Sequence, residues 1–313
     1  MKTVAIKAYA KVNLTLQIVG QAGGYHQLDS LVASVDLFDK IVLKKRKDGL
    51  CSVVMKGLGS ESIPPEENNA LKAGEAFAKA FQTTGADITV YKNIPLGAGL
   101  GGSSADAAGV LRGMAKLYGV NDPNKLCELA DALGSDIRYM LFGGFARMQG
   151  RGERVEPLAV DEKLHFLLLC PSEGVSTKEC YRKYDEYAKV ELGANGENAT
   201  QNCIDALLQK DVFKAGRYLK NDLFKPASEL CVSVKKAWEE ANSFSPLGAV
   251  MTGSGSCVLA MFENREFCEW AKSRYRGKAR AIVAQTVLPN GKERSWRNPY
   301  SLSEEELTLL SKE

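Results

Sequence analysis

Long apolar runs, a charge excess and histidine pairs are all missing from this sequence of 313 residues. No apolar stretch approaches the ~18 residues that cross a membrane. Lysines at positions 2, 7 and 11 interrupt the first residues, so we expect neither a membrane partner nor a signal peptide, and a cytoplasmic location. Lys and Arg number 41 against 38 Asp and Glu, a net charge of only +3, which gives no reason to expect nucleic acid as a partner.

Paired metal ligands are also lacking. The sequence has two histidines, His26 and His165, and its eight cysteines form no CxxC pair. Structural zinc sites use tetrahedral sets of such ligands, so we expect none here, and we expect all eight cysteines to be free thiols. His165 lies in an apolar run and is predicted to be structural.

The length suggests two domains, at ~150 residues for each. Apolar and polar residues alternate from 12 to 18, the period of a half-buried strand. Further strands are predicted at 31–44, 87–91, 164–169, 257–262 and 279–287, and helices at 69–81, 103–117, after Pro123, and at 178–187, 202–208, 228–241 and 265–274. This mixture indicates two α+β domains.

A domain boundary is expected near residues 157–163. We therefore divide the chain into an N-terminal domain over residues 1–160, a C-terminal domain over 161–290 and a tail over 291–313. Residues 188–200 are predicted to form a mobile loop. Residues 290–299 read as a linker, after which Ser303 and Glu306 fit a capping box that opens a short helix.

The strongest chemical signal is the glycine-rich segment 95–106, PLGAGLGGSSAD. Converging backbone N–H groups and a helix N-terminus favour a polyphosphate. The segment fails as a Walker A loop, because Ser103 stands where the lysine belongs. As a dinucleotide fingerprint it is weak, because the nearest acid, Asp122, lies in a turn and not at a strand end. The remaining interpretation is a cradle in which Ser103 and Ser104 assist the backbone.

Three segments together resemble the GHMP kinases, the superfamily of galactokinase, homoserine kinase and mevalonate kinase. The segment 95–106 resembles their second motif, AKVNL at 10–14 the first, and MTGSGS at 251–256 the third. The resemblance covers residues 1–288. It implies an N-terminal domain like domain 2 of ribosomal protein S5, a ferredoxin-like C-terminal domain, and ligands in the cleft between them.

Other segments resemble one branch of that superfamily, which uses ATP to phosphorylate the 2-hydroxyl of a cytidine-diphosphate-linked methylerythritol in the non-mevalonate isoprenoid route. They are Gly24-Tyr25-His26, Gly134-Ser135-Asp136, FGGFA at 142–146, GRGE at 150–153, and VST at 175–177 followed by Tyr181. Two positions depart from the branch's pattern, Gly23 in place of an aspartate and Arg138 in place of a proline.

The resemblance implies a role for each matched residue. Asp136 is the expected general base and Lys11 its charge partner. The expected ATP contacts are Pro95, Gly97, Gly99, Leu100, Gly101, Gly102, Ser103, Ser104 and one of Asn68 and Asn69, with Mg²⁺ as a cofactor at Ser104. The expected substrate contacts are Asn13, Tyr25, His26, Thr177, Tyr181, Gly253, Ser254 and Gly255, and Asp106 is expected to support the phosphate loop.

Two alternatives stay open at this point. One is a GHMP kinase that acts on another small alcohol. The other is a regulator that keeps the fold and binds nucleotide without catalysis, although such a protein is expected to lack Lys11 or Asp136, and both are present. The partner in every case is a small molecule, and the chain is expected to be a monomer or homodimer.

Overall fold

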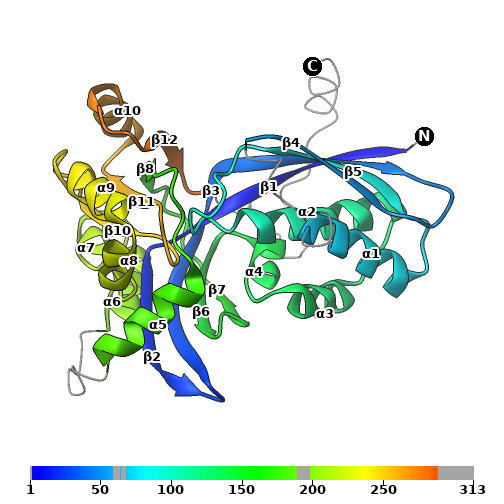
Figure 1. Cartoon of the computed structure of the whole chain (residues 1–313), viewed down its shortest axis with the longest axis horizontal. Helices are drawn as coiled ribbons and strands as arrows, with labels where there is room; N and C mark the ends of the chain where they lie inside the picture. The colour runs from blue at the N-terminus through cyan, green and yellow to red at the C-terminus, as the bar shows by residue number, and fades with distance from the viewer. Residues whose placement is uncertain (1, 59–63, 65–67, 189–197, 288–313) are drawn as a thin grey trace.

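The computed structural model describes residues 2–58, 64, 68–188 and 198–287 (Figure 1). Its strands are β1 (Thr3–Asn13), β2 (Thr15–Ala22), β3 (Tyr25–Lys45), β4 (Ser52–Gly57), β5 (Ala86–Lys92), β6 (Phe145–Gly150), β7 (Arg154–Pro157), β8 (His165–Cys170), β9 (Lys220–Asn221), β10 (Gly248–Met251), β11 (Val258–Phe262) and β12 (Arg280–Gln285). Its helices are α1 (Asn69–Phe81), α2 (Gly102–Tyr118), α3 (Pro123–Leu133), α4 (Ile137–Phe142), α5 (Thr177–Ala188), α6 (Ala199–Leu208), α7 (Val212–Arg217), α8 (Phe224–Leu230), α9 (Val232–Asn242) and α10 (Arg265–Arg274).

Strand β3 is the central strand of the first sheet. Over its 21 residues it pairs with β2 and β6 near its start and with β1 and β5 farther along. Helices α1 to α4 gather on one face of this sheet (Figure 1). The helix starts follow from local sequence: Asn68 caps α1 by accepting the N–H groups of residues 70 and 71, and Asp122 caps α3 just before Pro123.

The second sheet has four antiparallel strands in the order β10-β11-β8-β12. Helix α9 precedes β10 and α10 precedes β12, and both pack on the sheet. This strand order, with α9 leading into β10 and α10 into β12, is the ferredoxin-like arrangement that the resemblance implies, and α5 to α8 and β9 are inserted between β8 and α9. The expected α+β organisation with two sheets is therefore confirmed.

The expectation of a half-buried strand over residues 12–18 was wrong. The chain makes two strands with a break at Leu14, and the polar members of the alternation, Asn13, Thr15 and Gln17, are buried. Residues from the C-terminal half cover their face. The Thr15 and Thr200 hydroxyls are 2.9 Å apart, and the Thr200 N–H donates to Gln17 Oε1. The alternation thus marks an internal hydrogen-bonded face rather than a solvated one.

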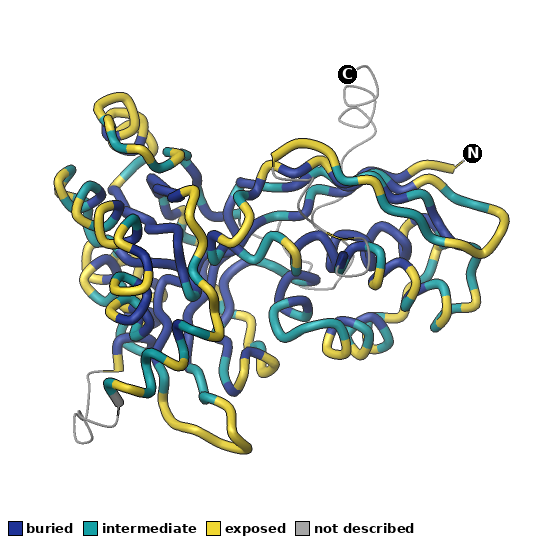
Figure 2. Tube along the Cα trace, in the orientation of Figure 1, coloured by how far each residue is buried: buried dark blue, intermediate teal, exposed yellow. Residues whose placement is uncertain are grey.

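The two halves of the chain are joined by strand pairing and by a common set of buried side chains. Strand β9, from the C-terminal half, pairs in parallel with β2, and Val35 forms a bridge with Thr286. One continuous set of buried apolar side chains joins residues of β1 and β3 to residues of α6 and β11. Buried segments accordingly run without interruption from one sheet to the other (Figure 2).

Several local predictions are confirmed. Helices span residues 69–81 and 265–274 as expected, and all eight cysteines are free. The single helix expected at 228–241 is two helices, because Cys231 has extended backbone angles (φ −140°, ψ 102°) between α8 and α9. The predicted linker and tail helix beyond residue 287, and most of the predicted loop at 188–200, lie outside the described residues.

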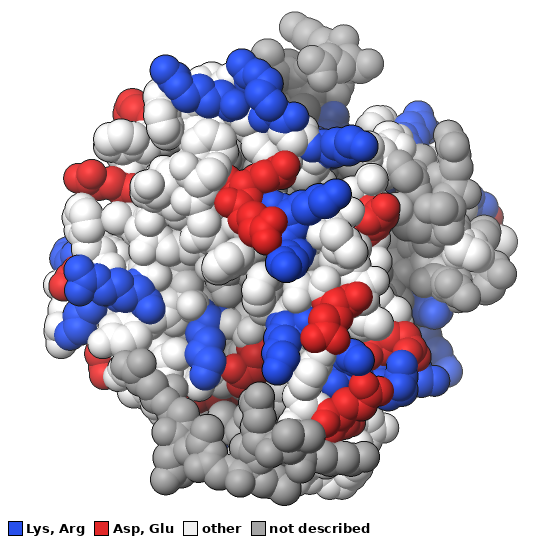
Figure 3. All heavy atoms as spheres, turned by 60° about the vertical axis from the view of Figure 1, so that its left-hand side comes forward, with Lys and Arg blue, Asp and Glu red and all other residues white. Residues whose placement is uncertain are grey.

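Within the described ranges, no helix is both long and apolar enough to traverse a lipid bilayer. On the face drawn in Figure 3, basic and acidic side chains are interspersed rather than separated by sign. That pattern agrees with the small net charge of the sequence.

Candidate active site

The three segments that resemble family motifs, 10–14, 95–106 and 251–256, are far apart in the sequence but meet at one place in the structure. The Lys11 N–H donates to the Leu100 carbonyl over 3.0 Å, and the Cys257 N–H donates to the Ala98 carbonyl over 3.2 Å. The Asn13 N–H donates to Thr252 Oγ1 over 2.9 Å. The segment 97–101 therefore lies between the end of β1 and the loop that leads into β11.

Glycine is required in this segment by both conformation and space. Gly97, Gly99 and Gly101 have φ of 62°, 73° and 70°, the left-handed region that other residues avoid. A Cβ on Gly99 would lie 2.2 Å from the Thr252 carbonyl oxygen. Helix α2 follows, with Gly101 at its N-cap and no side-chain cap, so its first N–H groups are left for another acceptor. An anion such as a phosphate fits this position.

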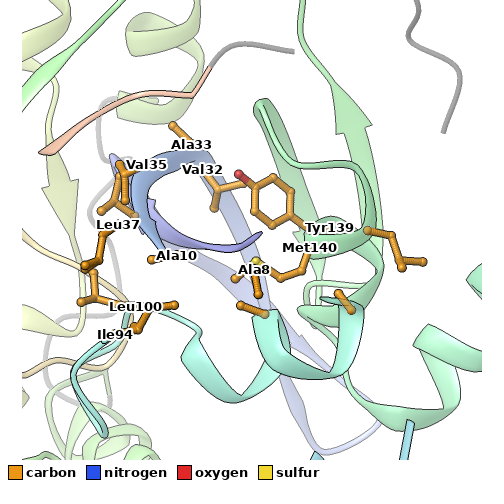
Figure 4. Close-up of a cluster of buried hydrophobic side chains, with 14 of the residues drawn as sticks. Ala8, Ala10, Val32, Ala33, Val35, Leu37, Ile94, Leu100, Tyr139 and Met140 are labelled. Atoms are coloured by element: carbon orange, nitrogen blue, oxygen red, sulfur yellow. The ribbon is translucent and has the colours of Figure 1, made fainter. Parts of the chain in front are cut away.

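Two apolar side chains hold the segment from beneath. Ile94 and Leu100 are buried and lie beside Leu37 in one cluster (Figure 4). The Leu100 side chain therefore faces the core, and only its backbone is available to a ligand.

Lys11 and Asp136 face each other, with Lys11 Nζ and Asp136 Oδ2 3.6 Å apart. The Lys11 side chain is 8% exposed and that of Asp136 34% exposed. Asp136 occupies the N-cap position of α4 but makes no capping hydrogen bond, so its carboxylate is not needed by the helix. Arg138, the departure from the family pattern, pairs instead with Asp131 of α3 and leaves Asp136 free of it.

Asn13 links these groups to the third motif. Its Oδ1 accepts from Lys11 Nζ over 2.6 Å and from the Gly253 N–H over 3.0 Å, and its Nδ2 donates to Ser30 Oγ. Asn13 thus orients the Lys11 ammonium as well as facing the cavity.

A cavity of about 360 Å³ opens above this pair. Its lining includes nine of the predicted site residues: Lys11, Asn13, Gly99, Gly101, Asp136, Thr177, Tyr181, Gly253 and Ser254. The Thr177 and Ser254 hydroxyls lie 2.8 Å apart, which joins the start of α5 to the third motif.

A second cavity of about 480 Å³ shares Leu28, Arg151 and Tyr181 with the first. Tyr25 and His26 stand at its wall because Gly23 and Gly24, with φ of 58° and 80°, form the tight turn of the β2–β3 hairpin. The departure at Gly23 therefore suits that turn.

Stacked rings form one side of this second cavity. The rings of His26 and Tyr181 stack with centroids 4.9 Å apart, and His26 Nε2 lies 2.7 Å from Asp185 Oδ1. Burial, with a smaller contribution from the nearby Asp136, raises the pKa of Tyr181 to about 12, so its phenol stays neutral at physiological pH.

Several predicted residues are not brought to the cavities. Asn68 is buried as the cap of α1, whereas Asn69 Nδ2 donates to Ser103 Oγ over 2.9 Å and so reaches the start of α2. Neither cavity lining includes Pro95, Gly97, Leu100, Gly102, Ser103, Ser104 or Gly255.

Sequence reasoning missed two charged residues of the site. Arg151, in the turn between β6 and β7, lines both cavities, and its guanidinium lies 4.0 Å from the centroid of the Tyr25 ring. An arginine between two glycines was the available signal. Asp185 was also missed, although its position four residues after Tyr181 places both on one face of α5.

Metal ligands are sparse here. In the part of the chain that the structure describes, no three His, Cys, Asp or Glu side chains are grouped so as to hold an ion. A metal ion therefore fits this site only together with an anionic ligand that supplies most of its coordination.

Comparison with known proteins identifies the family to which the chain is similar. Two family models match, GHMP kinases N terminal domain over residues 68–144 and GHMP kinases C terminal over residues 203–267. The chain is 34% identical to the 4-diphosphocytidyl-2-C-methyl-D-erythritol kinase of Caldicellulosiruptor saccharolyticus, over 91% of this chain and 97% of that protein. It is 37% identical to the enzyme of the same name from Caldanaerobacter subterraneus, over 92% and 98%.

Solved structures give the same result for the fold. A crystal structure of 4-(cytidine 5'-diphospho)-2C-methyl-D-erythritol kinase superposes with a TM-score of 0.75 at 29% identity, over 90% of this chain and 98% of that chain. Homoserine kinase from Cytophaga hutchinsonii superposes with a TM-score of 0.70 at 18% identity, over 92% and 95%, a likeness of fold alone.

Proposed function

Because the chain belongs to the 4-diphosphocytidyl-2-C-methyl-D-erythritol kinases, within the GHMP kinases, we propose that it transfers the γ-phosphoryl group of ATP to the 2-hydroxyl of that substrate, with Asp136 and Lys11 as catalytic residues. The observation that carries the assignment of residues is the 3.6 Å approach of Lys11 Nζ to Asp136 Oδ2 on the wall of a cavity, beside the glycine segment 97–101.

Asp136 accepts the proton of the substrate hydroxyl as the new bond to phosphorus forms. Its carboxylate is partly exposed and makes no capping bond, so it can reach a hydroxyl in the cavity. Phosphoryl transfer requires little more of the protein than positioning and charge neutralisation. Lys11, held by Asn13, supplies positive charge for the transferring group while it keeps Asp136 in place.

The glycine segment and the free N–H groups at the start of α2 receive the triphosphate. Asn69, through its bond to Ser103, is the asparagine that reaches this part of the site, and Asn68 shapes the start of α1 beside it. Ser104 is the hydroxyl that we assign to Mg²⁺, which would arrive with the triphosphate and would neutralise part of its charge.

The second cavity receives the cytidine part of the acceptor. Aromatic faces at Tyr25, His26 and Tyr181 suit a pyrimidine ring, and the polar edge of His26 suits its hydrogen-bonding groups. Arg151 belongs to both cavities, so its guanidinium is placed for the diphosphate that joins cytidine to the alcohol. Thr177 and Ser254 then lie on the side of the alcohol, with Gly253 and Gly255 giving the third motif its shape.

Coupled ADP release tests the substrate. With Mg-ATP, 4-diphosphocytidyl-2-C-methyl-D-erythritol should give turnover, and homoserine and mevalonate at equal concentration should give less than about 1% of it, because neither can occupy the second cavity. Equal turnover with either small alcohol would favour the kinase of another alcohol. No turnover with any acceptor, together with retained ATP binding, would favour a non-catalytic regulator.

The division into residues 1–160 and 161–290 also stands as a proposal. The pairing of β9 with β2 argues that the two parts act as one unit in solution. We place this unit in the cytoplasm, as a monomer or homodimer that acts on small molecules rather than nucleic acid or membranes.

A further inference from the structure

A buried group of three ionisable side chains lies directly under the phosphate-binding loop, defined here as residues 93–101 between β5 and α2. Lys92, the last residue of β5, contacts Asp39 of β3 and Asp106 of α2 through its ammonium. The side chains of Lys92 and Asp39 are 0% exposed and that of Asp106 is 4% exposed. None of the three lines either cavity of the site, so their role is not contact with a substrate.

Asp39 holds the start of the loop. Besides its contact with Lys92, its Oδ1 accepts the N–H groups of Asn93 and Ile94, over 2.5 and 2.8 Å. These are the first two residues of the loop, so their backbone direction is set by a side chain of the central strand β3.

Asp106 holds the other end. Its Oδ2 accepts from Lys92 Nζ over 2.6 Å, and it lies on α2 four residues after the helix begins. A Cβ built on Gly102 would lie only 3.5 Å from the same Lys92 nitrogen, so the ammonium packs against the first turn of the helix. Lys92 therefore joins both ends of the loop to β3.

Burial of such a group costs free energy, because each ion loses its hydration. Burial raises the pKa of Asp106 to about 8. Burial alone would lower the pKa of Lys92, but the two carboxylates outweigh it and raise that pKa. Asp106 Oδ1 is buried with no hydrogen-bond partner among the described residues. An apolar set of equal volume would pack here without these costs, but it would not direct the two N–H groups of the loop.

We propose that Lys92, Asp39 and Asp106 are positioning residues that hold the phosphate-binding loop in the conformation that receives ATP. The inference rests on the proposed function. If it holds, cutting the contact between Lys92 and Asp106 weakens ATP binding, whereas the affinity for the cytidine acceptor is kept, because the cavity proposed for its cytidine part is lined by residues of β3 and α5.

The test compares three single variants with the wild-type chain. Asp106→Ala removes the hydrogen bond to Lys92. The substitution lies in an alanine-rich stretch of α2, where alanine favours the helix. Asp106→Asn keeps an acceptor for Lys92. Asp87→Ala is the matched control, since it breaks an ion pair with Arg46 at the opposite end of the same strand β5. Calorimetric titration with Mg-ATP gives the ATP Kd without acceptor, steady-state assays give the acceptor KM, and thermal melts report folding.

Asp106→Ala should raise the ATP Kd about tenfold, the scale of one buried charged hydrogen bond. Asp106→Asn should restore the Kd to within about threefold of wild type, Asp87→Ala should leave it unchanged, and the acceptor KM should stay constant throughout. If Asp106→Ala fails to fold, Asp106→Ser takes its place, because its hydroxyl is too short to reach Lys92.

An ATP Kd within about twofold of wild type in folded Asp106→Ala would overturn the inference. An equal rise in the acceptor KM, or no recovery with Asp106→Asn, would also overturn it, since either result indicates general damage. Absence of ATP binding by the wild-type chain would refute the proposed function and this inference with it, whereas the other outcomes leave the proposed function standing.

Discussion

Replacing Asp136 by asparagine isolates the proton-accepting role of that residue. Asparagine has nearly the shape of aspartate, and Asp136 makes no capping bond, so the start of α4 should survive unchanged. The Coulomb attraction lost with Lys11 at 3.6 Å is about 1 kcal/mol in water and about 5 kcal/mol at an effective dielectric constant near 20. Since a third of the Asp136 side chain is exposed, the lower part of that range applies, and stability should change by less than about 1 kcal/mol.

Activity should change far more. A positioned general base contributes roughly 10²- to 10⁴-fold, so kcat should fall by that factor, equivalent to about 3–5 kcal/mol of barrier. The ATP Kd should be equal or lower, because a negative charge facing the triphosphate has been removed. Coupled ADP release measures kcat, and calorimetry measures the Kd.

Asp131→Asn is the matched control, because Asp131 lies on α3, five residues before Asp136, and the same substitution there breaks only its pair with Arg138. It should leave kcat within about twofold of wild type. If Asp136→Asn keeps more than about a tenth of the wild-type kcat, or if Asp131→Asn loses as much, Asp136 is not the base.

Three further substitutions separate the parts of the site. Tyr181→Ala should raise the acceptor KM about tenfold, which is the scale of one base stacked on an aromatic ring, without changing the ATP Kd. An unchanged acceptor KM would contradict stacking of the base on Tyr181. Arg151→Ala should raise the acceptor KM by a similar factor, because a charged hydrogen bond to the diphosphate is lost, and an effect on ATP alone would contradict this role. Gly99→Ala should lower the melting temperature more than Gly119→Ala does. Both have φ of 73°, but only at Gly99 would the new Cβ meet a backbone oxygen, that of Thr252 at 2.2 Å, while nothing lies within 4 Å at Gly119; equal losses would mean that the close approach is not important.

Local signals predicted the isolated elements well. The helix at 69–81 was found because apolar residues recur on one face, and the helix at 265–274 was also predicted; the structure adds that an asparagine caps the start of each. The helix expected at 228–241 was misjudged, since nothing in that segment's periodicity marks the extended backbone at Cys231. The residues at 12–18 were misjudged for another reason: a polar residue that faces a buried partner looks the same in sequence as one that faces water.

For the site, glycine positions and family motifs identified the residues that must be glycine, lysine or aspartate. Asp106 was expected to support the phosphate loop, but Arg151, Lys92 and Asp39 were not found, because their partners lie on other strands and helices and no local spacing links them.

The sequence by itself determined the local conformations and the list of reactive groups, because capping, turn formation and side-chain chemistry depend on neighbours along the chain. Only the tertiary structure decided that Lys11 meets Asp136, that Asn13 holds the third motif, and that Gly99 and Gly101 line the same cavity. Those contacts join residues that are far apart in the sequence, and they exist only because burial of a shared core brings the two sheets together.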